Sequence, residues 1–258
     1  MEKEQGEEAP STFQVALLAF ASSLGPFATN GIVPSFVSLT DVLNVSMTQM
    51  QTALTLYLLA FAVGSLIVGA ISDTYGRCRV LALGMLFFSV ATIFATYSTS
   101  LTELNFWRVV QGFSASVGQV ITQAMVRDRW GGMTATKVMS LIGMLFALSP
   151  AFAPVIGGWI VVSFGWQAVF WFLFLYAMSI GIIAAFALKE SLPKEKRKPL
   201  NLRMLVLNYG NCFTHKAFVC GVLSHSMCSM GALLVVAGGA DFVVRVMGFS
   251  VDGFAWMS

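Results

Sequence analysis

Residues 49–71 read QMQTALTLYLLAFAVGSLIVGAI, an apolar run without a charged side chain. A helix needs about 20 residues to cross the roughly 30 Å hydrocarbon core of a bilayer, so this run is long enough to span a membrane. Similar runs recur along the chain and predict seven membrane-spanning helices, at 14–38, 49–71, 80–97, 104–126, 138–162, 168–188 and 217–240. The predicted fold class is therefore an all-α polytopic membrane protein.

The composition favours the same fold class and excludes several others. Of the 258 residues, 57% are hydrophobic and 10% are charged, whereas a soluble domain carries about 25% charged residues. The alternating segments of a membrane β-barrel are not found. The basic residues lie in a few loops without interleaved aromatic residues, which argues against nucleic-acid binding. The four cysteines lack metal-ligand spacing, and neither a metal nor a cofactor is expected.

The loop charges predict the orientation of the chain. Lys and Arg stay on the cytoplasmic side of membrane proteins. Here they occur in the tail and in the second, fourth and sixth connections, but not in the first, third and fifth. We therefore expect a cytoplasmic N-terminus. The expected segments are a cytoplasmic tail over 1–12, a six-helix bundle over 13–188, a basic cytoplasmic linker over 189–216, and a seventh helix with the start of an incomplete eighth over 217–258.

The fourth span contains Arg108, the one charged side chain expected at membrane depth. Such groups are costly in lipid and usually functional. Steps of four and three from Arg108 follow a helix face that is small and polar throughout. This pattern indicates either a wet cavity or a tight helix contact, and we favour the cavity. The face and its neighbours comprise Arg108, Gln111, Gly112, Ala115, Gln119, Thr122 and Gln123.

The fifth span carries a stripe of small residues interrupted by two prolines. Small residues permit close packing of helix backbones, and each proline removes a helix hydrogen bond and bends the axis. We expect a packing and hinge surface rather than a reactive one. Its residues are Gly143, Ala147, Pro150, Pro154, Gly157 and Gly158.

The connection between the second and third spans reads GAISDTYGRCR at 69–79 and is expected to be a tight turn, with Gly69 and Gly76 in it. The carboxylate of Asp73 and the guanidinium groups of Arg77 and Arg79 can pair with neighbouring charges or helix ends. Such pairs can form in one conformation and break in another.

Three of these segments, in order, resemble signatures of the major facilitator superfamily and, within it, of the Bcr/CflA drug-resistance subfamily. GAISDTYGR at 69–77 resembles the loop motif between helices two and three, RVVQGFSAS at 108–116 the helix-four motif, and SPAFAPVIGG at 149–158 the helix-five antiporter motif. VRDRWGG at 126–132 and FGWQAVFWFL at 164–173 also resemble this subfamily. The resemblance covers nearly the whole chain.

The resemblance implies a multi-pass protein of the bacterial inner membrane that exports amphipathic antibiotics in exchange for protons. Two six-helix bundles rock about a central site in such proteins, and this chain would supply the N-terminal bundle and the first helix of the second. By the same resemblance, Asp73 and Arg77 gate the cytoplasmic side and Arg108 assists proton coupling. Pro150, Pro154, Gly157 and Gly158 would shape the contact with the other bundle. We also expect Arg77 to pair with Asp128.

The segment ATNGIVP at 28–34 departs from the subfamily pattern, because its central position is normally Asp and is Asn30 here. An amide cannot titrate, and no Asp or Glu lies inside the first six predicted spans. Either Asn30 still binds substrate while another group couples protons, or coupling is lost. His225 in the seventh span is the candidate group, since imidazole titrates near neutral pH. The alternative for His225 is a hydrogen-bonded helix contact.

The expected partners are protons, a small amphipathic substrate, the lipid bilayer, and either a missing C-terminal bundle or a second copy of the chain. The chain ends at the start of the predicted eighth helix, whereas the superfamily fold has twelve. It is therefore interpreted as a fragment of the full transporter or, alternatively, as an inactive or oligomeric truncated half-transporter. A seven-helix receptor or retinal protein is disfavoured, because residues 217–240 contain no Lys for a Schiff base. No catalytic triad, phosphate loop or metal cluster indicates an enzyme.

Overall fold

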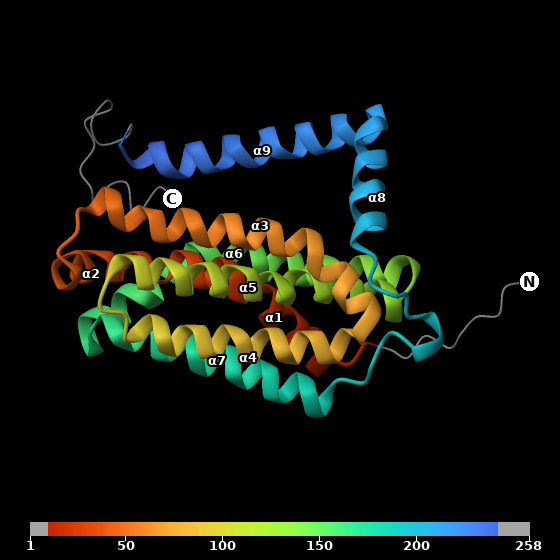
Figure 1. Cartoon of the computed structure of the whole chain (residues 1–258), viewed down its shortest axis with the longest axis horizontal. Coiled ribbons are helices and arrows are strands. Elements are labelled where there is room, and N and C mark those ends of the chain that lie inside the picture. The colour runs from red at the N-terminus through yellow and green to blue at the C-terminus, as the bar shows by residue number, and fades with distance from the viewer. Residues whose placement is uncertain (1–9, 242–258) are drawn as a thin grey trace, which may run out of the picture. The chain divides into compact units, whose positions relative to one another are not determined.

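The computed structural model describes residues 10–241, which are helical without any strand (Figure 1). The fold therefore confirms the predicted all-α class. The helices are α1 (Thr12–Asn30), η1 (Val33–Ser35), α2 (Phe36–Leu43), α3 (Met47–Tyr75), α4 (Arg77–Thr96), α5 (Leu101–Arg129), α6 (Gly132–Phe164), α7 (Trp166–Ala187), η2 (Lys194–Lys196), α8 (Leu202–Thr214) and α9 (Lys216–Asp241).

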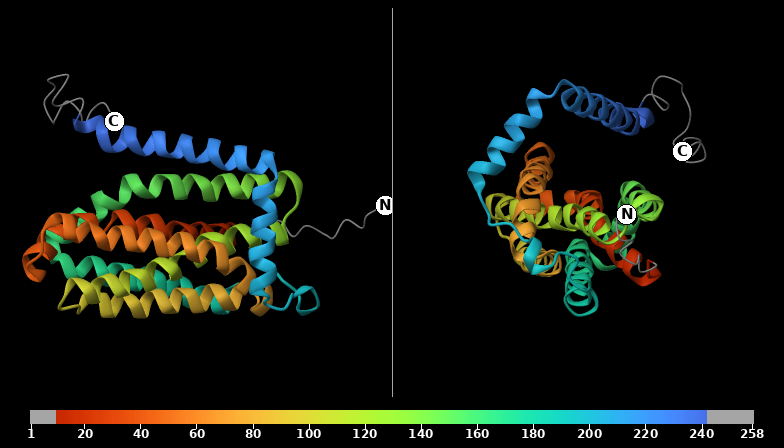
Figure 2. Two further views of the ribbon diagram at one scale, coloured as in Figure 1. Left: turned by 45° about the horizontal axis from the view of Figure 1, so that its top comes forward. Right: turned by 90° about the vertical axis from the view of Figure 1, so that its right-hand side faces the viewer.

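The described residues form two compact units, one ending at Leu200 and one beginning at Asn201. In the first unit, α1 and α3 to α7 run side by side as a bundle (Figure 2). The central helix is α5, which packs against α1, α3 and α4, while α4 also packs along α7 and α1 along α6. The second unit holds α8 and α9, which contact each other.

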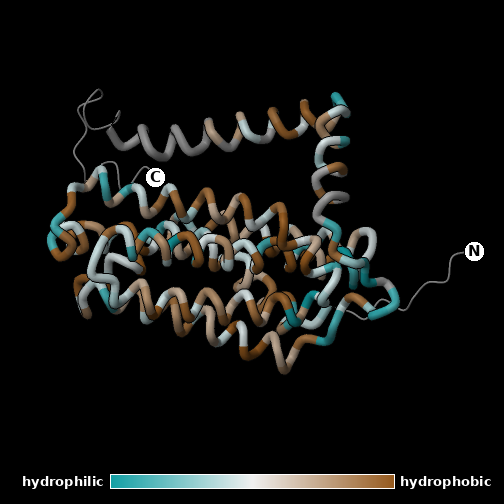
Figure 3. The backbone as a smooth tube through the Cα atoms, in the orientation of Figure 1, coloured by the Kyte–Doolittle hydropathy of each residue, from teal (hydrophilic) through white to brown (hydrophobic). Residues whose placement is uncertain are grey.

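Five stretches of the described residues are long and apolar enough to cross a membrane: Thr12–Leu43, Met47–Tyr75, Arg77–Thr96, Gly132–Phe164 and Trp166–Ala187. Helix α5 is as long as α3, with 29 residues each, but its polar residues lower its hydropathy. In Figure 3 hydrophobic residues follow the bundle helices, and hydrophilic residues gather at their ends and in the segment after α7. Large apolar side chains such as Leu59, Phe87 and Phe186 face outward. These features are those of a multi-pass membrane protein.

The first predicted span, 14–38, is not one straight helix. Helix α1 ends at Asn30, a 3₁₀ turn follows over Val33–Ser35, and α2 begins at Phe36. Pro34 lies in this turn, where its missing N–H cannot continue an α-helical ladder. The bend places Asn30 at a helix end rather than within a regular helix.

The segment predicted as a basic linker, 189–216, also has its own structure. Residues up to Leu200 belong to the first unit and contain the short turn η2, whereas α8 lies in the second unit. The first part of this segment contacts the ends of α3, α4 and α5 through hydrogen bonds of Lys198, Glu190 and Ser191.

Candidate functional site

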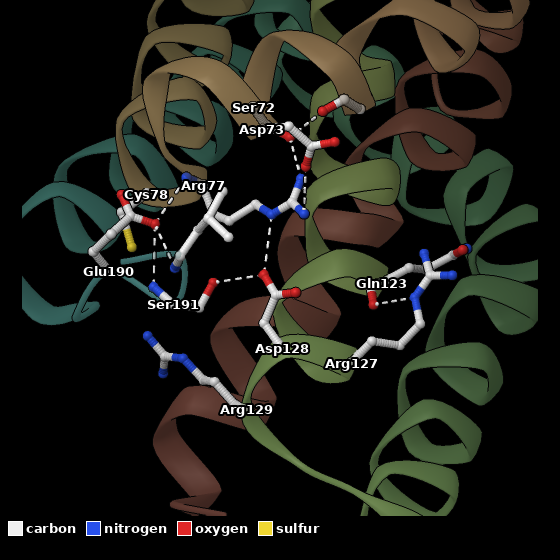
Figure 4. Close-up of polar contacts among 12 residues, drawn as sticks. Ser72, Asp73, Arg77, Cys78, Gln123, Arg127, Asp128, Arg129, Glu190 and Ser191 are labelled. Carbon is white, nitrogen blue, oxygen red and sulfur yellow. Dashed lines mark hydrogen bonds and ion pairs between the residues drawn. The ribbon is translucent and has the colours of Figure 1, made fainter. Parts of the chain in front are cut away.

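Arg77, the first residue of α4, lies at the centre of a charged cluster (Figure 4). Its Nη2 atom lies 2.7 Å from an Asp73 carboxylate oxygen, and its Nε donates to Asp128 Oδ2 at 3.1 Å. Its Nη1 donates to the Ser72 hydroxyl. The Arg77 side chain is 10% exposed, so these three partners take the place of most of the water molecules that would otherwise bind its guanidinium. One guanidinium thus joins the end of α3 to the end of α5.

Glu190, directly after α7, adds a carboxylate to this cluster. Its Oε1 accepts from the backbone N–H of Arg77 at 2.8 Å and from the backbone N–H groups of Ser191 and Leu192. Its Oε2 lies 3.6 Å from Arg197 Nη2. A carboxylate at the first residue of a helix satisfies a free N–H and interacts favourably with the helix dipole. We refer to Asp73, Arg77, Asp128 and Glu190 as the Arg77 cluster.

The segment after α7 is held to the same helix ends by further hydrogen bonds. The Lys198 backbone N–H donates to the Asp73 carbonyl, and the Thr74 hydroxyl donates to the Lys198 carbonyl at 2.8 Å. Arg129 donates to the carbonyl of Lys189. Together with Ser191, whose hydroxyl donates to Asp128 at 3.2 Å, these contacts draw 189–198 across the ends of α3, α4 and α5.

Gly76 makes the close turn between α3 and α4 possible. Its φ is +102°, a conformation that side chains disfavour. A Cβ atom there would also clash with the Glu190 carboxylate and press on the Arg197 guanidinium. Gly69, one helical turn before Asp73, has more room, since its nearest neighbour would be Val120 at 3.8 Å.

Arg108 lies on α5 and is fully buried, with 0% of its surface exposed. Its Nη1 donates to Gln111 Oε1 at 2.9 Å, and Gln111 Nε2 donates to the Thr92 hydroxyl at 2.8 Å. The guanidinium carbon lies 4.2 Å from the centre of the Tyr57 ring, within the range of a cation–π contact. The Tyr57 hydroxyl in turn donates to the Gly25 carbonyl.

This group of Tyr57, Thr92, Arg108 and Gln111 is the Arg108 network. Two nitrogen atoms of Arg108, Nε and Nη2, have no hydrogen-bond partner within the described part of the chain. Burying a cation with incomplete hydrogen bonding is costly. The network therefore holds a strongly desolvated charge whose hydrogen bonding is incomplete within the described residues.

The small and polar face of α5 packs tightly, so the preference for a wet cavity along it is wrong where this face is buried. A Cβ atom at Gly112 would clash with the backbone of Tyr57. Ala115 is 1% exposed, and the Thr122 hydroxyl donates to the carbonyl of Leu18. Small residues here let α5 approach α1 and α3 closely. Gln119, farther along, is half-buried.

Asn30 bonds within its own helix, since its Nδ2 donates to the Pro26 carbonyl at 2.8 Å. No hydrogen bond joins it to Arg108 among the described residues. The residues assigned to the helix-one and helix-four sites are therefore not directly bonded to each other in the described part of the chain. Asn30 is half-buried at the bend that follows α1.

Some residues of the helix-five stripe pack against the bend after α1, and others are exposed. A Cβ atom at Gly157 would clash with the carbonyl oxygen of Gly31, so α6 and the bend after α1 touch at this glycine. Gly158 faces Pro34 more loosely. Pro150 is exposed and Pro154 half-buried, and α6 is helical past both. Gly143 and Ala147 are also exposed, and a Cβ atom at Gly143 would meet nothing within 4 Å among the described residues.

His225 lies within α9, but its side chain falls outside the described residues. Among the described residues no group of three or more His, Cys, Asp and Glu side chains could hold a metal ion.

Several contributors were missed by sequence reasoning. Tyr57 and Thr92 are ordinary residues in apolar helices, and only the contact of Tyr57 with Arg108 and the bond of Thr92 with Gln111 distinguish them. Glu190 had a signal, because it is an acidic residue directly after an apolar span and before the basic run KEKRK at 194–198.

Comparison with known families gives one match, to the model of the Major Facilitator Superfamily, over residues 15–258. Among curated proteins, the chain is 31% identical over 247 residues to a "Bicyclomycin resistance protein homolog" of Haemophilus influenzae, covering 95% of this chain and 62% of that protein. It is 29% identical over 241 residues to "Multidrug resistance protein D" of Escherichia coli, covering 90% of this chain and 60% of that protein. The chain thus spans about 60% of the length of these relatives.

Solved structures show the same fold at low sequence identity. The proton:xylose symporter XylE superimposes with a TM-score of 0.63 at 15% identity, covering 86% of this chain and 55% of that one. The human organic anion transporter MFSD10 superimposes with a TM-score of 0.58 at 21% identity, covering 74% of this chain and 51% of that one.

Proposed function

This chain belongs to the Major Facilitator Superfamily, and from that premise we propose that it forms the N-terminal part of an exporter of amphipathic drugs. Members of the superfamily move small molecules across lipid bilayers, and they are not enzymes. The names of the relatives, which include bicyclomycin and multidrug resistance proteins, support efflux as the direction and drugs as the substrate class. The proposed driving force is the inward flow of protons, with export by alternating access.

The Arg77 cluster is the observation that carries this proposal. It ties α3, α4, α5 and the segment after α7 together at one end of the bundle through exchangeable ion pairs. The Asp73 side chain is 43% exposed, so a carboxylate of this pair remains open to a further partner. An alternating-access protein needs such a contact, which can form when one side is closed and break when that side opens.

The orientation proposed from the loop charges puts this cluster on the cytoplasmic side of a bacterial inner membrane, with the N-terminus also cytoplasmic. Asp73, Arg77 and Asp128 then act as a cytoplasmic gate, with Gly76 permitting the turn, while Gly69 lies within α3 rather than in the turn. The exposed part of the helix-five stripe, including Pro150, would meet the other bundle. That bundle is supplied either by further sequence or by a second copy of the chain.

Arg108 is proposed to assist proton coupling, with Gln111, Gly112 and Gln119 on its helix face and Asn30 contributing to substrate binding. The two unpartnered nitrogens of Arg108 support a role for this charge beyond packing. Because Asn30 cannot titrate, a different group must carry the proton, and His225 is the candidate. If His225→Gln exports drug with an unchanged pH dependence, that assignment is wrong.

The test is drug export by cells that lack their own major efflux pumps. The chain is expressed alone and together with any coding sequence that follows Ser258, and bicyclomycin susceptibility and efflux of a fluorescent amphipathic dye are measured. We expect efflux that collapses when the proton gradient is dissipated, and that Asp73→Asn reduces. Arg127→Ala is the control, since Arg127 is exposed and its Nε donates to the Gln123 carbonyl of its own helix. Dye efflux that persists without a proton gradient would contradict the proposal.

A further inference from the structure

A groove of about 1030 Å³ runs between α3 and α4, with α5 as its floor. It exists because α3 and α4 each pack along α5 but hardly touch each other. Its walls are apolar side chains of all three helices, among them Leu59, Val63, Leu83, Phe87 and Phe113. The proposed gate and the Arg108 network use none of these side chains, so the groove is a separate feature.

Among the described residues that line this groove, Arg79 alone is charged. It is exposed, and its side chain forms no ion pair or hydrogen bond with any other described residue. Arg77, two positions earlier, is buried and paired in the Arg77 cluster. Residues two apart point to nearly opposite sides of a helix. Arg77 therefore points toward the Arg77 cluster, and Arg79 points toward the groove.

The groove has the position and depth of a phospholipid site. Arg79 comes directly before the apolar run that starts at Val80, and Tyr75, 57% exposed, lines the same end. Cations and tyrosines are favoured at this depth, next to the headgroups. On α4 the lining runs from Arg79 to Phe87, which is about 12 Å along a helix. That length is close to one leaflet, about half of the roughly 30 Å hydrocarbon core.

We propose that this groove binds one phospholipid, with the phosphate on the Arg79 guanidinium and an acyl chain along Val63, Leu83 and Phe113. Charge complementarity selects this occupant: a lone guanidinium beside an apolar channel matches an anionic head on an apolar tail. An amphipathic cation would meet the Arg79 charge unfavourably. The proposal requires only that α3 and α4 lie in a membrane, and it stands or falls independently of drug export.

The test measures lipid binding to the purified full chain after detergent delipidation, by native mass spectrometry. The probes are dioleoylphosphatidylglycerol and dioleoylglycerol, which share acyl chains but differ in the phosphate. The wild type is expected to bind the phosphatidylglycerol more tightly. Arg79→Gln should weaken this binding about fivefold, as expected for one interfacial basic residue, and remove the preference for the phosphate.

A second variant tests the acyl-chain part of the site. Val63→Trp fills the groove and should abolish binding of both probes, and Leu83→Trp does the same from α4 if Val63→Trp fails to fold. The matched controls are Arg127→Gln and Val90→Trp, which change an exposed arginine and an outward valine away from the groove. Unchanged helicity and gel-filtration elution establish that each variant is folded.

Two results would overturn the proposal. One is equal phosphatidylglycerol affinity in the wild type and Arg79→Gln, which would leave the groove as a nonspecific apolar surface. The other is a dimer that excludes lipid and that Val63→Trp dissociates, which would assign the groove to a second copy of the chain. Loss of drug export with lipid binding intact would count against the proposed function and not against this site.

Discussion

The Nε atom of Arg77 donates to the Oδ2 atom of Asp128 at 3.1 Å, and this contact joins the start of α4 to the end of α5. The residues are 51 positions apart in the sequence. Because Arg77 also holds Asp73, a single buried guanidinium balances two carboxylates from two different helices. Its loss should therefore affect more than one contact.

Arg77→Ala should lower the free energy of unfolding by about 2 kcal/mol, because it leaves two carboxylates without their cation. The exposure of Asp73, at 43%, keeps the loss below that of a fully buried pair. The measurement is an SDS unfolding titration of the protein in mild detergent. Arg127→Ala, as a surface control, should remain within about 0.5 kcal/mol of the wild type.

The charge exchange Arg77→Asp with Asp128→Arg should recover part of the stability that either single substitution loses. The guanidinium introduced at position 128 could then pair with Asp73 and with the carboxylate introduced at position 77. A double variant as unstable as the two single variants added together would show that Arg77 and Asp128 do not interact favourably.

Arg108→Met should abolish transport while leaving the free energy of unfolding within about 1 kcal/mol of the wild type. Replacing a buried, incompletely bonded charge by an apolar side chain of similar length is often neutral or stabilising. Transport and SDS unfolding are measured on the same preparation. Tyr57→Phe, which removes the hydroxyl bonded to Gly25 but keeps the ring under Arg108, should cost about 1 kcal/mol. A strongly unstable but transporting Arg108→Met would make Arg108 a structural residue.

Gly157→Ala should destabilise the protein by about 1 to 3 kcal/mol, because the new methyl group would clash with the Gly31 carbonyl. Gly143→Ala on the same helix is the matched control, since a Cβ atom there meets nothing within 4 Å. It should be neutral or stabilising by up to about 1 kcal/mol, given the higher helix propensity of alanine. Thermal unfolding in detergent compares the two variants. Equal effects would mean that α6 does not approach the bend after α1 this closely.

Glu190→Gln should lower the free energy of unfolding by about 1 kcal/mol. The substitution removes the negative charge that Glu190 places beside the backbone N–H of Arg77, the first residue of α4. The effect should shrink at high salt, which screens the ion pair with Arg197 and the interaction with the helix dipole. Glu195→Gln, in the exposed turn η2, is the control and should be silent. A salt-independent loss would point to packing rather than charge.

The orientation is tested with alkaline phosphatase fusions, since this reporter is active only outside the cytoplasm. A fusion after Thr99, between α4 and α5, should be active, because that connection carries no Lys or Arg. A fusion after Pro193, in the basic segment that follows α7, should be inactive. The reverse pattern would move the Arg77 cluster to the outer side and remove its role as a cytoplasmic gate.

The fold class and the family were accessible from the sequence, since both depend on local information. Apolar runs longer than a bilayer crossing specify membrane helices at 49–71 and 168–188 without reference to any other part of the chain. The position of Arg108 within the apolar run 104–126 likewise predicted that it lies at membrane depth, which stays a prediction. The bend after α1 also had a local signal, the proline at position 34, but the apolar run 14–38 was long enough to be interpreted as one continuous helix.

The contacts within the bundle were decided by the tertiary structure alone. Hydropathy specifies that a helix lies in lipid, but not which neighbour each of its faces meets. The small face of α5 illustrates this, because the same residues suit a wet cavity or a close helix contact, and only the backbone of Tyr57 beside Gly112 distinguishes the two. Glu190 on Arg77 and Gly157 on Gly31 likewise join residues that are distant along the chain. Such pairs depend on how the helices pack, which a one-dimensional pattern of apolar residues does not contain.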